Sequence, residues 1–343
     1  MKGTIWMPLP FIPLAVAAGA AVATAVAGKK GHDSYKNMKE TKNIAQSMDK
    51  QYKTVFNIFD QVRQDTNTQF EKYGELKLNI LNGTMKEFIS EFKKLKNVDF
   101  TDKTTIDSLE DVSDSKHFMQ EIEKQVIAAS DLLKSGVSAI AGGGLAAFGA
   151  LGAATTFGAA STGTAIASLS GVAATNATLA FLGGGSLAAG GLGMAGGMAV
   201  LGGIALAPAL ALGSMIFAAS TKKKLEEMKI KKEEVSVEMQ KLQSATSILK
   251  EIKLYTIKLS NLTTETTTLF ADYIATMSSI IDEKGIDYRN FSDDEQLAIR
   301  YTAELAIILK KLLDTPVIDE GGNRSKTLEN ILKTTEKSIK HMY

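Results

Sequence analysis

The chain has 343 residues, with 39 Lys and Arg against 38 Asp and Glu, so its formal net charge is +1. This balance lacks the basic excess typical of nucleic-acid-binding proteins and the acidic excess typical of disordered chains. The sequence has no Cys, which excludes a disulfide framework, a thiolate metal site and a cysteine nucleophile.

The first predicted element is an apolar segment of 20 residues, Leu9–Gly28, within an N-terminal unit of residues 1–30. This length is sufficient for a helix to cross the hydrocarbon core of a bilayer. Three interpretations are open. The segment is a membrane anchor with Lys29 and Lys30 on the cytoplasmic side, a buried apolar helix, or a signal peptide cleaved after the A-x-A-like Ala25–Ala27.

Residues 31–134 are predicted to form the first part of a helical bundle. Apolar residues recur at three- and four-residue spacing from Tyr35 to Val98, which predicts a long amphipathic helix. Gly74 and Gly83 are expected to kink or break it. A turn-rich stretch follows over 99–115, and a helix restarts near Lys116. The apolar stripe consists of Met38, Ala45, Met48, Tyr52, Val55, Phe59, Val62, Tyr73, Leu76, Ile80, Phe88, Phe92 and Leu95.

The next element, residues 135–221, is a run of 87 residues without Asp, Glu, Lys, Arg or His, and it holds 20 of the 29 Gly. So long an uncharged run predicts a membrane-inserting helical hairpin or pair of hairpins, whereas the alternative is a deeply buried soluble core. The Gly193–Gly197 and Gly149–Ala153 pairs have the small-xxx-small spacing that lets helices pack closely in lipid.

Larger apolar side chains and packing glycines of this block are the residues predicted to enter the bilayer. They are Gly136, Ile140, Leu145, Phe148, Leu151, Phe157, Leu179, Phe181, Leu187, Leu192, Gly193, Gly197, Leu201, Ile204, Leu206, Leu210, Ile216 and Phe217. Because each Gly disfavours a helix by about 1 kcal/mol, the block is expected to be marginal in water and in lipid. It would then fold against the long helices and enter lipid when released.

Lysines flank both ends of the block, with Lys124 and Lys134 before it and Lys222–Lys224 after it. The bias of Lys and Arg toward one side of a membrane predicts that both ends stay on the same side, with an even number of crossings.

A second long helix is predicted from Thr221 to Lys284, in the unit of residues 222–285, because apolar residues from Leu225 to Ile280 follow a heptad-like spacing. Its length is on the order of 90 Å at 1.5 Å per residue, and Gly285 is expected to end it. Thr, Ala and Ser on its stripe favour a partner within the same chain.

Residues 286–343 are predicted to form the C-terminal helices. The sequence from Ser292 to Glu295 fits a capping box, which starts a helix that should extend to about Asp314. A loop with Pro316 follows, and then a last helix from about Lys326 to His341. No segment alternates with period two, so no sheet is predicted.

The sequence offers no recognisable catalytic or cofactor site. The three His residues, at 32, 117 and 341, lie far apart without the spacing of metal ligands, and no phosphate-binding GxxxxGK[ST] motif occurs. The carboxylates at the start of the 293–314 helix are interpreted as a helix cap. We therefore expect no enzyme activity, no metal and no cofactor.

The stretch from Phe157 to Gly203 resembles the signature of a family of poorly characterised bacterial proteins. The opening WMPLPFIPLAVAAGAA, the sequence GELKLNIL (Gly74–Leu81) and the sequence LLDTPVIDE (Leu312–Glu320) are similar to that family too. In layout, the chain resembles apolipoprotein-L proteins and α-helical pore-forming toxins, which place an apolar hairpin between amphipathic helices. This likeness implies membrane permeabilisation, although the block here is richer in Gly, Ala, Ser and Thr than the toxin hairpins.

The sequence therefore predicts an all-α protein, an elongated helical bundle with two long amphipathic helices and a Gly/Ala-rich transmembrane-type hairpin block. The predicted function is a pore-forming or membrane-disrupting effector at the cytoplasmic membrane, soluble before insertion and acting in bacterial defence or as a toxin. Its expected partners are the lipid bilayer, further copies of itself and a protein partner or activator, without nucleic acid. A second hypothesis is a membrane-anchored scaffold whose coiled-coil-like helices bind a protein partner.

Overall fold

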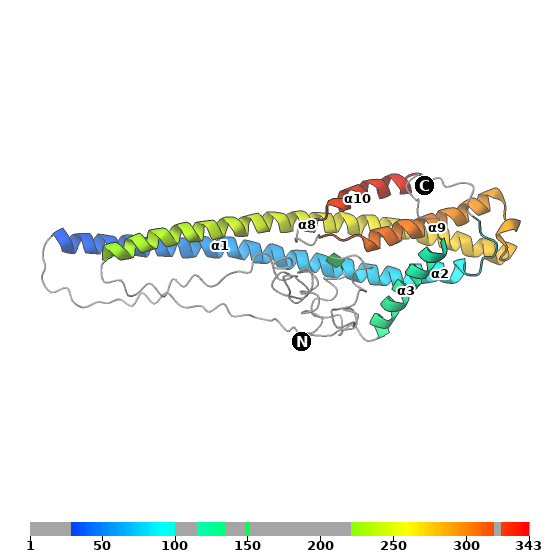
Figure 1. The fold of residues 1–343 in the computed structure, drawn as a ribbon, viewed down its shortest axis with the longest axis horizontal. Helices are drawn as coiled ribbons and strands as arrows, with labels where there is room; N and C mark the ends of the chain where they lie inside the picture. The colour runs from blue at the N-terminus through cyan, green and yellow to red at the C-terminus, as the bar shows by residue number, and fades with distance from the viewer. Residues whose placement is uncertain (1–28, 100–114, 135–148, 151–220, 319–323, 343) are drawn as a thin grey trace. The chain divides into compact units, whose positions relative to one another are not determined.

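The computed structural model describes residues 29–99, 115–134, 149–150, 221–318 and 324–342 (Figure 1). These residues form helices and no strand, which confirms the all-α class for the described part of the chain. The elements are α1 (Lys29–Ile80), η1 (Leu81–Met85), α2 (Lys86–Phe92), α3 (Ser115–Lys134), α8 (Thr221–Lys284), η7 (Tyr288–Asn290), α9 (Asp293–Asp314) and α10 (Lys326–Ile339).

The chain divides into two compact units. Unit 1 consists of Met1–Arg63 and Gly203–Ser247, and unit 2 consists of Gln64–Gly202 and Ile248–Tyr343. Both α1 and α8 contribute residues to each unit, because both pass a unit boundary.

Helix ends follow the local signals of the sequence. α8 begins and ends at the predicted residues, and Gly285 after it has φ +88°, the left-handed conformation that ends many helices. The capping box of α9 is confirmed. Ser292 Oγ accepts a hydrogen bond from the Glu295 N–H at 3.3 Å, and the Ser292 N–H donates to Glu295 Oε2 at 2.7 Å.

The first long helix is interrupted once. It begins at Lys29 and continues without a break through Gly74, whereas Gly83 lies in the π-helical turn Leu81–Met85. The extra residue in a π turn shifts the apolar stripe, and Leu81 and Met85 are both buried as a result. The predicted break is therefore found at Gly83 but not at Gly74.

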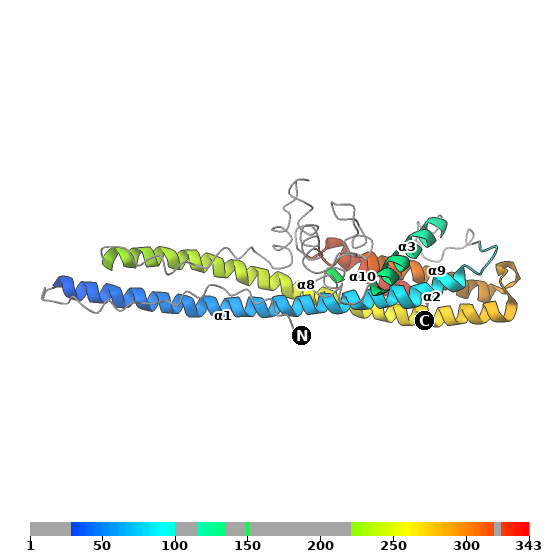
Figure 2. The same cartoon turned by 90° about the horizontal axis from the view of Figure 1, so that it is seen from below.

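Unit 1 contains a parallel pair of helices. Lys229 Nζ of α8 lies 4.0 Å from Glu40 Oε1 of α1. The small core of unit 1 consists of Ala45 and Met48 of α1 and Met228 and Val235 of α8. The pair can be followed side by side in Figures 1 and 2. Of the predicted α1 stripe, Met38 is 58% exposed because it lies close to the end of the pair.

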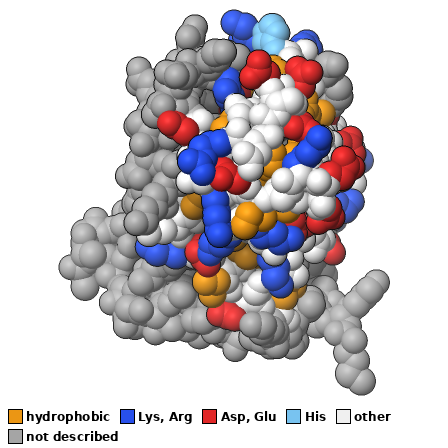
Figure 3. All heavy atoms as spheres, turned by 90° about the vertical axis from the view of Figure 1, so that its right-hand side faces the viewer, with side chains coloured by type: hydrophobic (Ala, Val, Ile, Leu, Met, Phe, Trp, Pro, Cys, Tyr) orange, Lys and Arg blue, Asp and Glu red, His pale blue; other side chains and the backbone are white. Residues whose placement is uncertain are grey.

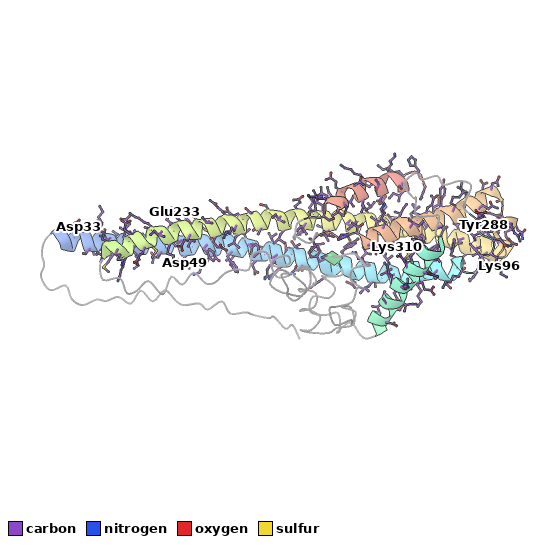
Figure 4. All side chains as sticks on the ribbon, viewed as in Figure 1. Asp33, Asp49, Lys96, Glu233, Tyr288 and Lys310 are labelled. Carbon is purple, nitrogen blue, oxygen red and sulfur yellow. The ribbon has the colours of Figure 1, made fainter. Side chains whose placement is uncertain are left out.

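In unit 2, α1 and α8 are again parallel. The Thr66 hydroxyl donates to the Leu249 carbonyl at 3.4 Å, and the Tyr73 hydroxyl lies 3.3 Å from Thr263 Oγ1. Beyond the helices, the backbones of Lys96 and Asp287 pair in an isolated parallel β-bridge. Figure 4 shows Lys96 beside Tyr288 at the end of this pair. α9 and α10 complete the core, together with α2 and α3.

Buried threonines line the seam of α8. Thr256, Thr263 and Thr266 are almost completely buried, and each hydroxyl donates to the carbonyl four residues earlier in the helix at 2.7–2.8 Å. The donor is thus satisfied within the helix, so that a small polar side chain is tolerated where a leucine zipper would place a larger apolar one.

Candidate functional site

The predicted membrane-inserting residues, from Gly136 to Phe217, all lie outside the described residues, as does the apolar segment Leu9–Gly28. Among the helices of the described ranges, none combines the length and apolar character needed to cross a membrane. The structure does describe the surroundings of the uncharged block. These are α3 before it, α8 after it, and the short helical piece Gly149–Ala150 within it.

α3 docks on unit 2 and leads into the block. Ile122 and Ala129 are fully buried in the core, while Lys93 Nζ forms an ion pair with Glu123 Oε1 at 2.6 Å. About two turns further on, the Ser130 hydroxyl donates to Asn82 Oδ1 at 2.9 Å. α3 therefore packs on α2 and η1 in the opposite chain direction, with Glu123 near Lys93 and Ser130 near Asn82.

Gly149 contacts the backbone of α1. A Cβ atom at this position would overlap the Phe70 carbonyl oxygen, and would lie 2.7 Å from the Phe70 carbonyl carbon and 3.0 Å from the Gly74 nitrogen. Because these are backbone atoms, no side-chain rotation relieves the overlap, and glycine alone fits. The predicted pairing of Gly149 with Ala153 is not described, whereas its packing on α1 is.

Ala150 completes this backbone attachment. It is fully buried, and its carbonyl oxygen accepts a hydrogen bond from the Val317 N–H at 2.9 Å. Val317 itself lies in the loop after α9 and is fully buried. The attachment joins the uncharged block to two elements of unit 2 through main-chain atoms rather than through large apolar side chains.

A charged network joins α3 to α9. Lys310 Nζ lies 2.7 Å from Asp314 Oδ2 and 3.1 Å from Glu121 Oε2, and the Gln125 amide donates to Asp314 Oδ1 at 2.9 Å. The Lys310 and Asp314 side chains are only 16% and 19% exposed. Burial acts to lower the pKa of Lys310, but the hydrogen bonds to Asp314 and Glu121 outweigh it and raise that pKa.

Lys77 of α1 lies beside this network and is fully buried. Its Nζ atom is 4.5 Å from the centre of the Tyr73 ring, an arrangement in which the ring face attracts the cation. Burial lowers the pKa of Lys77 to about 7, against the opposing effect of the Asp314 charge. A lysine that is half charged at neutral pH is unusual in a helix core.

Tyr73 fixes the centre of unit 2. Its hydroxyl lies within 3.3 Å of Thr263 Oγ1 on α8 and of the Leu312 carbonyl oxygen on α9, and burial raises its pKa above the ordinary value.

The sequence analysis did not predict a role for Lys77. The available signal was its position on the buried stripe, four residues after Tyr73 and four before Leu81.

The arrangement is a docking site for α3 and for Gly149–Ala150. In the parts of the chain that the structure describes, no three His, Asp or Glu side chains are grouped to hold a metal. Apolar packing of Ile122, Ala129 and Ala150, together with charged and backbone contacts, holds these elements on unit 2. Comparisons with protein families, curated proteins and solved structures found no match.

Proposed function

We propose that this chain is a membrane-inserting α-helical effector that permeabilises bilayers, and that unit 2 holds the uncharged block until release. The observation that carries the proposal is the run of 87 residues without an ionisable side chain, bounded by lysine-bearing helices. In this proposal the chain is an elongated bundle with a transmembrane-type hairpin block, and its partners are the bilayer and further copies of itself.

The docking site supports a releasable block. Gly149 and Ala150 contact the backbone of Phe70 and Val317, and neither has a side chain larger than a methyl group. α3 is held in part by the network around Lys310, and ionic contacts respond to pH, salt and competing anions. No catalytic step is assigned to the chain, because permeabilisation requires none.

Dye leakage tests the proposal. The purified full chain is added to vesicles loaded with a small fluorescent dye, and we expect release of the dye with time. A charge in the block, such as Leu201→Asp, should reduce leakage strongly, because Asp at a helix centre costs about 2.5–3.5 kcal/mol on insertion. The matched control is Thr334→Asp on the exposed face of α10. Equal leakage by wild type and Leu201→Asp would refute insertion of this part.

A membrane-anchored scaffold is the second candidate. Large apolar side chains are exposed on both helices of unit 1, with Tyr35 at 68% and Ile230 at 61%, and such residues suit a protein partner. A scaffold should bind vesicles without releasing dye. Gly193→Leu or Gly197→Leu should abolish leakage through a packed pore and leave simple anchoring unchanged.

A further inference from the structure

Both uncharged segments of the chain join unit 1 at the same end of its helix pair. Leu9–Gly28 directly precedes α1, and the block of residues 135–221 leads directly into α8. The two helices are parallel, because Glu40 of α1 lies beside Lys229 of α8, and the register advances together to Tyr52 and Glu238. Figure 4 shows the same order, with Glu233 of α8 between Asp33 and Asp49 of α1.

Lysines are concentrated at that end. Residues 29–42 contain five Lys and two acidic residues, and residues 221–232 contain six Lys and two acidic residues. Together they carry +7, so the rest of a chain whose net charge is +1 carries −6. We call these eleven lysines the lysine collar. They are Lys29, Lys30, Lys36, Lys39, Lys42, Lys222, Lys223, Lys224, Lys229, Lys231 and Lys232.

The collar opposes the helix dipole. Neither α1 nor α8 has an acidic residue in its first turn, although a helix N-terminus favours negative charge. α1 begins with two lysines, and three lysines follow Thr221 at the start of α8. α9 of the same chain has the favourable arrangement, with Asp293, Asp294 and Glu295 in its first turn. Helix stability therefore does not explain the lysines at the starts of the two long helices.

One face of unit 2 lacks such an excess of lysine. On its face at the junction of α8 and α9, basic and acidic side chains are intermixed (Figure 3). The excess of lysine in the collar coincides with the points at which both uncharged segments join unit 1.

We propose that the lysine collar binds the anionic headgroups of a phospholipid bilayer and presents both uncharged segments to that bilayer. This inference rests on the proposed membrane function and adds the lipid class and the end of unit 1 that meets the membrane. Clustered lysines next to an apolar segment are attracted to the negative surface of a membrane. A nucleic acid would also attract lysines, but it does not offer the apolar environment in which the adjacent uncharged segments could be buried.

Vesicle flotation with the full chain tests the collar. We compare neutral phosphatidylcholine vesicles with vesicles that contain about 30% phosphatidylglycerol, at about 0.05 M and 0.5 M salt. Wild type should bind the anionic vesicles at least about tenfold more tightly at low salt, and the preference should vanish at high salt. In the collar variant, four exposed lysines of the collar are replaced by Gln. In the control variant, four exposed lysines of unit 2 are replaced by Gln. These are Lys36→Gln, Lys39→Gln, Lys222→Gln and Lys232→Gln for the collar, and Lys86→Gln, Lys250→Gln, Lys337→Gln and Lys340→Gln for the control.

The collar variant should lose the preference for anionic vesicles, and the control should keep it. Equal loss in both variants, or no loss in the collar variant, overturns the proposal. If the wild type binds neutral and anionic vesicles equally and releases dye equally from both, the role of the collar is refuted but the membrane function is not. Collar-dependent binding without leakage supports the collar and refutes permeabilisation. Binding to a short DNA duplex without any vesicle binding refutes both. Because lipid preference and salt dependence are also measured on wild type, a misfolded variant does not block the test.

Discussion

Replacing Lys77 by Met removes a buried charge while keeping an unbranched side chain of similar length. In the folded protein the pKa of Lys77 is about 7, compared with 10.5 for an ordinary lysine. One pKa unit corresponds to about 1.36 kcal/mol, so the cost of burying the charged form has an upper limit on the order of 4 kcal/mol at neutral pH. Replacement of a whole buried ion pair by apolar groups is often neutral or stabilises by about 1–4 kcal/mol, and here Asp314 keeps Lys310 and Gln125 as partners when the Lys77 charge is removed. We therefore expect Lys77→Met to raise the free energy of unfolding by an amount in this range.

The pH dependence has a definite sign. Between pH 7 and 10.5 the unfolded chain binds the Lys77 proton more tightly than the folded chain does. Stability of the wild type should therefore rise with pH across this window, by up to about 1.4 kcal/mol per pH unit, and this group should contribute no slope below it. Lys77→Met should lack that part of the slope, whereas Asp314 keeps its contacts with Lys310 and Gln125.

Urea denaturation followed by far-UV circular dichroism, repeated from about pH 6 to pH 9, measures both effects. The matched control is Lys72→Met, because Lys72 is an exposed lysine of the same helix. Its free energy of unfolding should change by less than about 0.5 kcal/mol. A Lys77→Met variant that is less stable than wild type, or that keeps the full wild-type slope, would refute the argument that Lys77 is buried at a cost.

Three further substitutions test individual contacts. Gly149→Val should lose the attachment to α1, at about 1–3 kcal/mol for overpacking, and should speed hydrogen exchange in α3. Gly83→Ala is its control, because a Cβ there meets nothing within 4 Å, and equal exchange in both variants would contradict the attachment. Tyr73→Phe should destabilise by about 1 kcal/mol in urea, because Thr263 and Leu312 lose a partner, and no loss would contradict a satisfied hydroxyl. Ser292→Ala should lower the melting temperature through loss of the α9 cap, also worth about 1 kcal/mol, and an unchanged value would show that the cap is dispensable.

Much of the helical structure follows from local sequence. The bounds of α8 follow from its periodic apolar residues and from Gly285, and the start of α9 follows from the Ser292–Glu295 box. These signals are readable because caps and breakers act on the nearest turn, without reference to the rest of the fold. The interruption near Gly83 could be predicted for the same reason. Its π-helical geometry could not, because it depends on the burial of Leu81 and Met85 in the core.

The docking site was less predictable. Lys77 is a charged residue at a position of the apolar stripe, four residues from Tyr73 and from Leu81, and the packing of α8 and α9 around Tyr73 buries it. The sequence predicted that Gly149 would pack a helix together with Ala153, and it did not indicate a contact with α1. The role of Gly149 depends on the approach of the Phe70 backbone, 79 positions earlier in the chain.

By itself, the sequence determined the all-helical class, the two long amphipathic helices and the segregation of charge from the uncharged run, because these depend on composition and on periods of a few residues. Tertiary structure decided the direction in which the long helices pair. A heptad stripe is the same for parallel and antiparallel neighbours, whereas the contact of Glu40 with Lys229 fixes the parallel one in unit 1. That direction brings the two lysine-rich helix starts together, and no pattern along the chain could establish it.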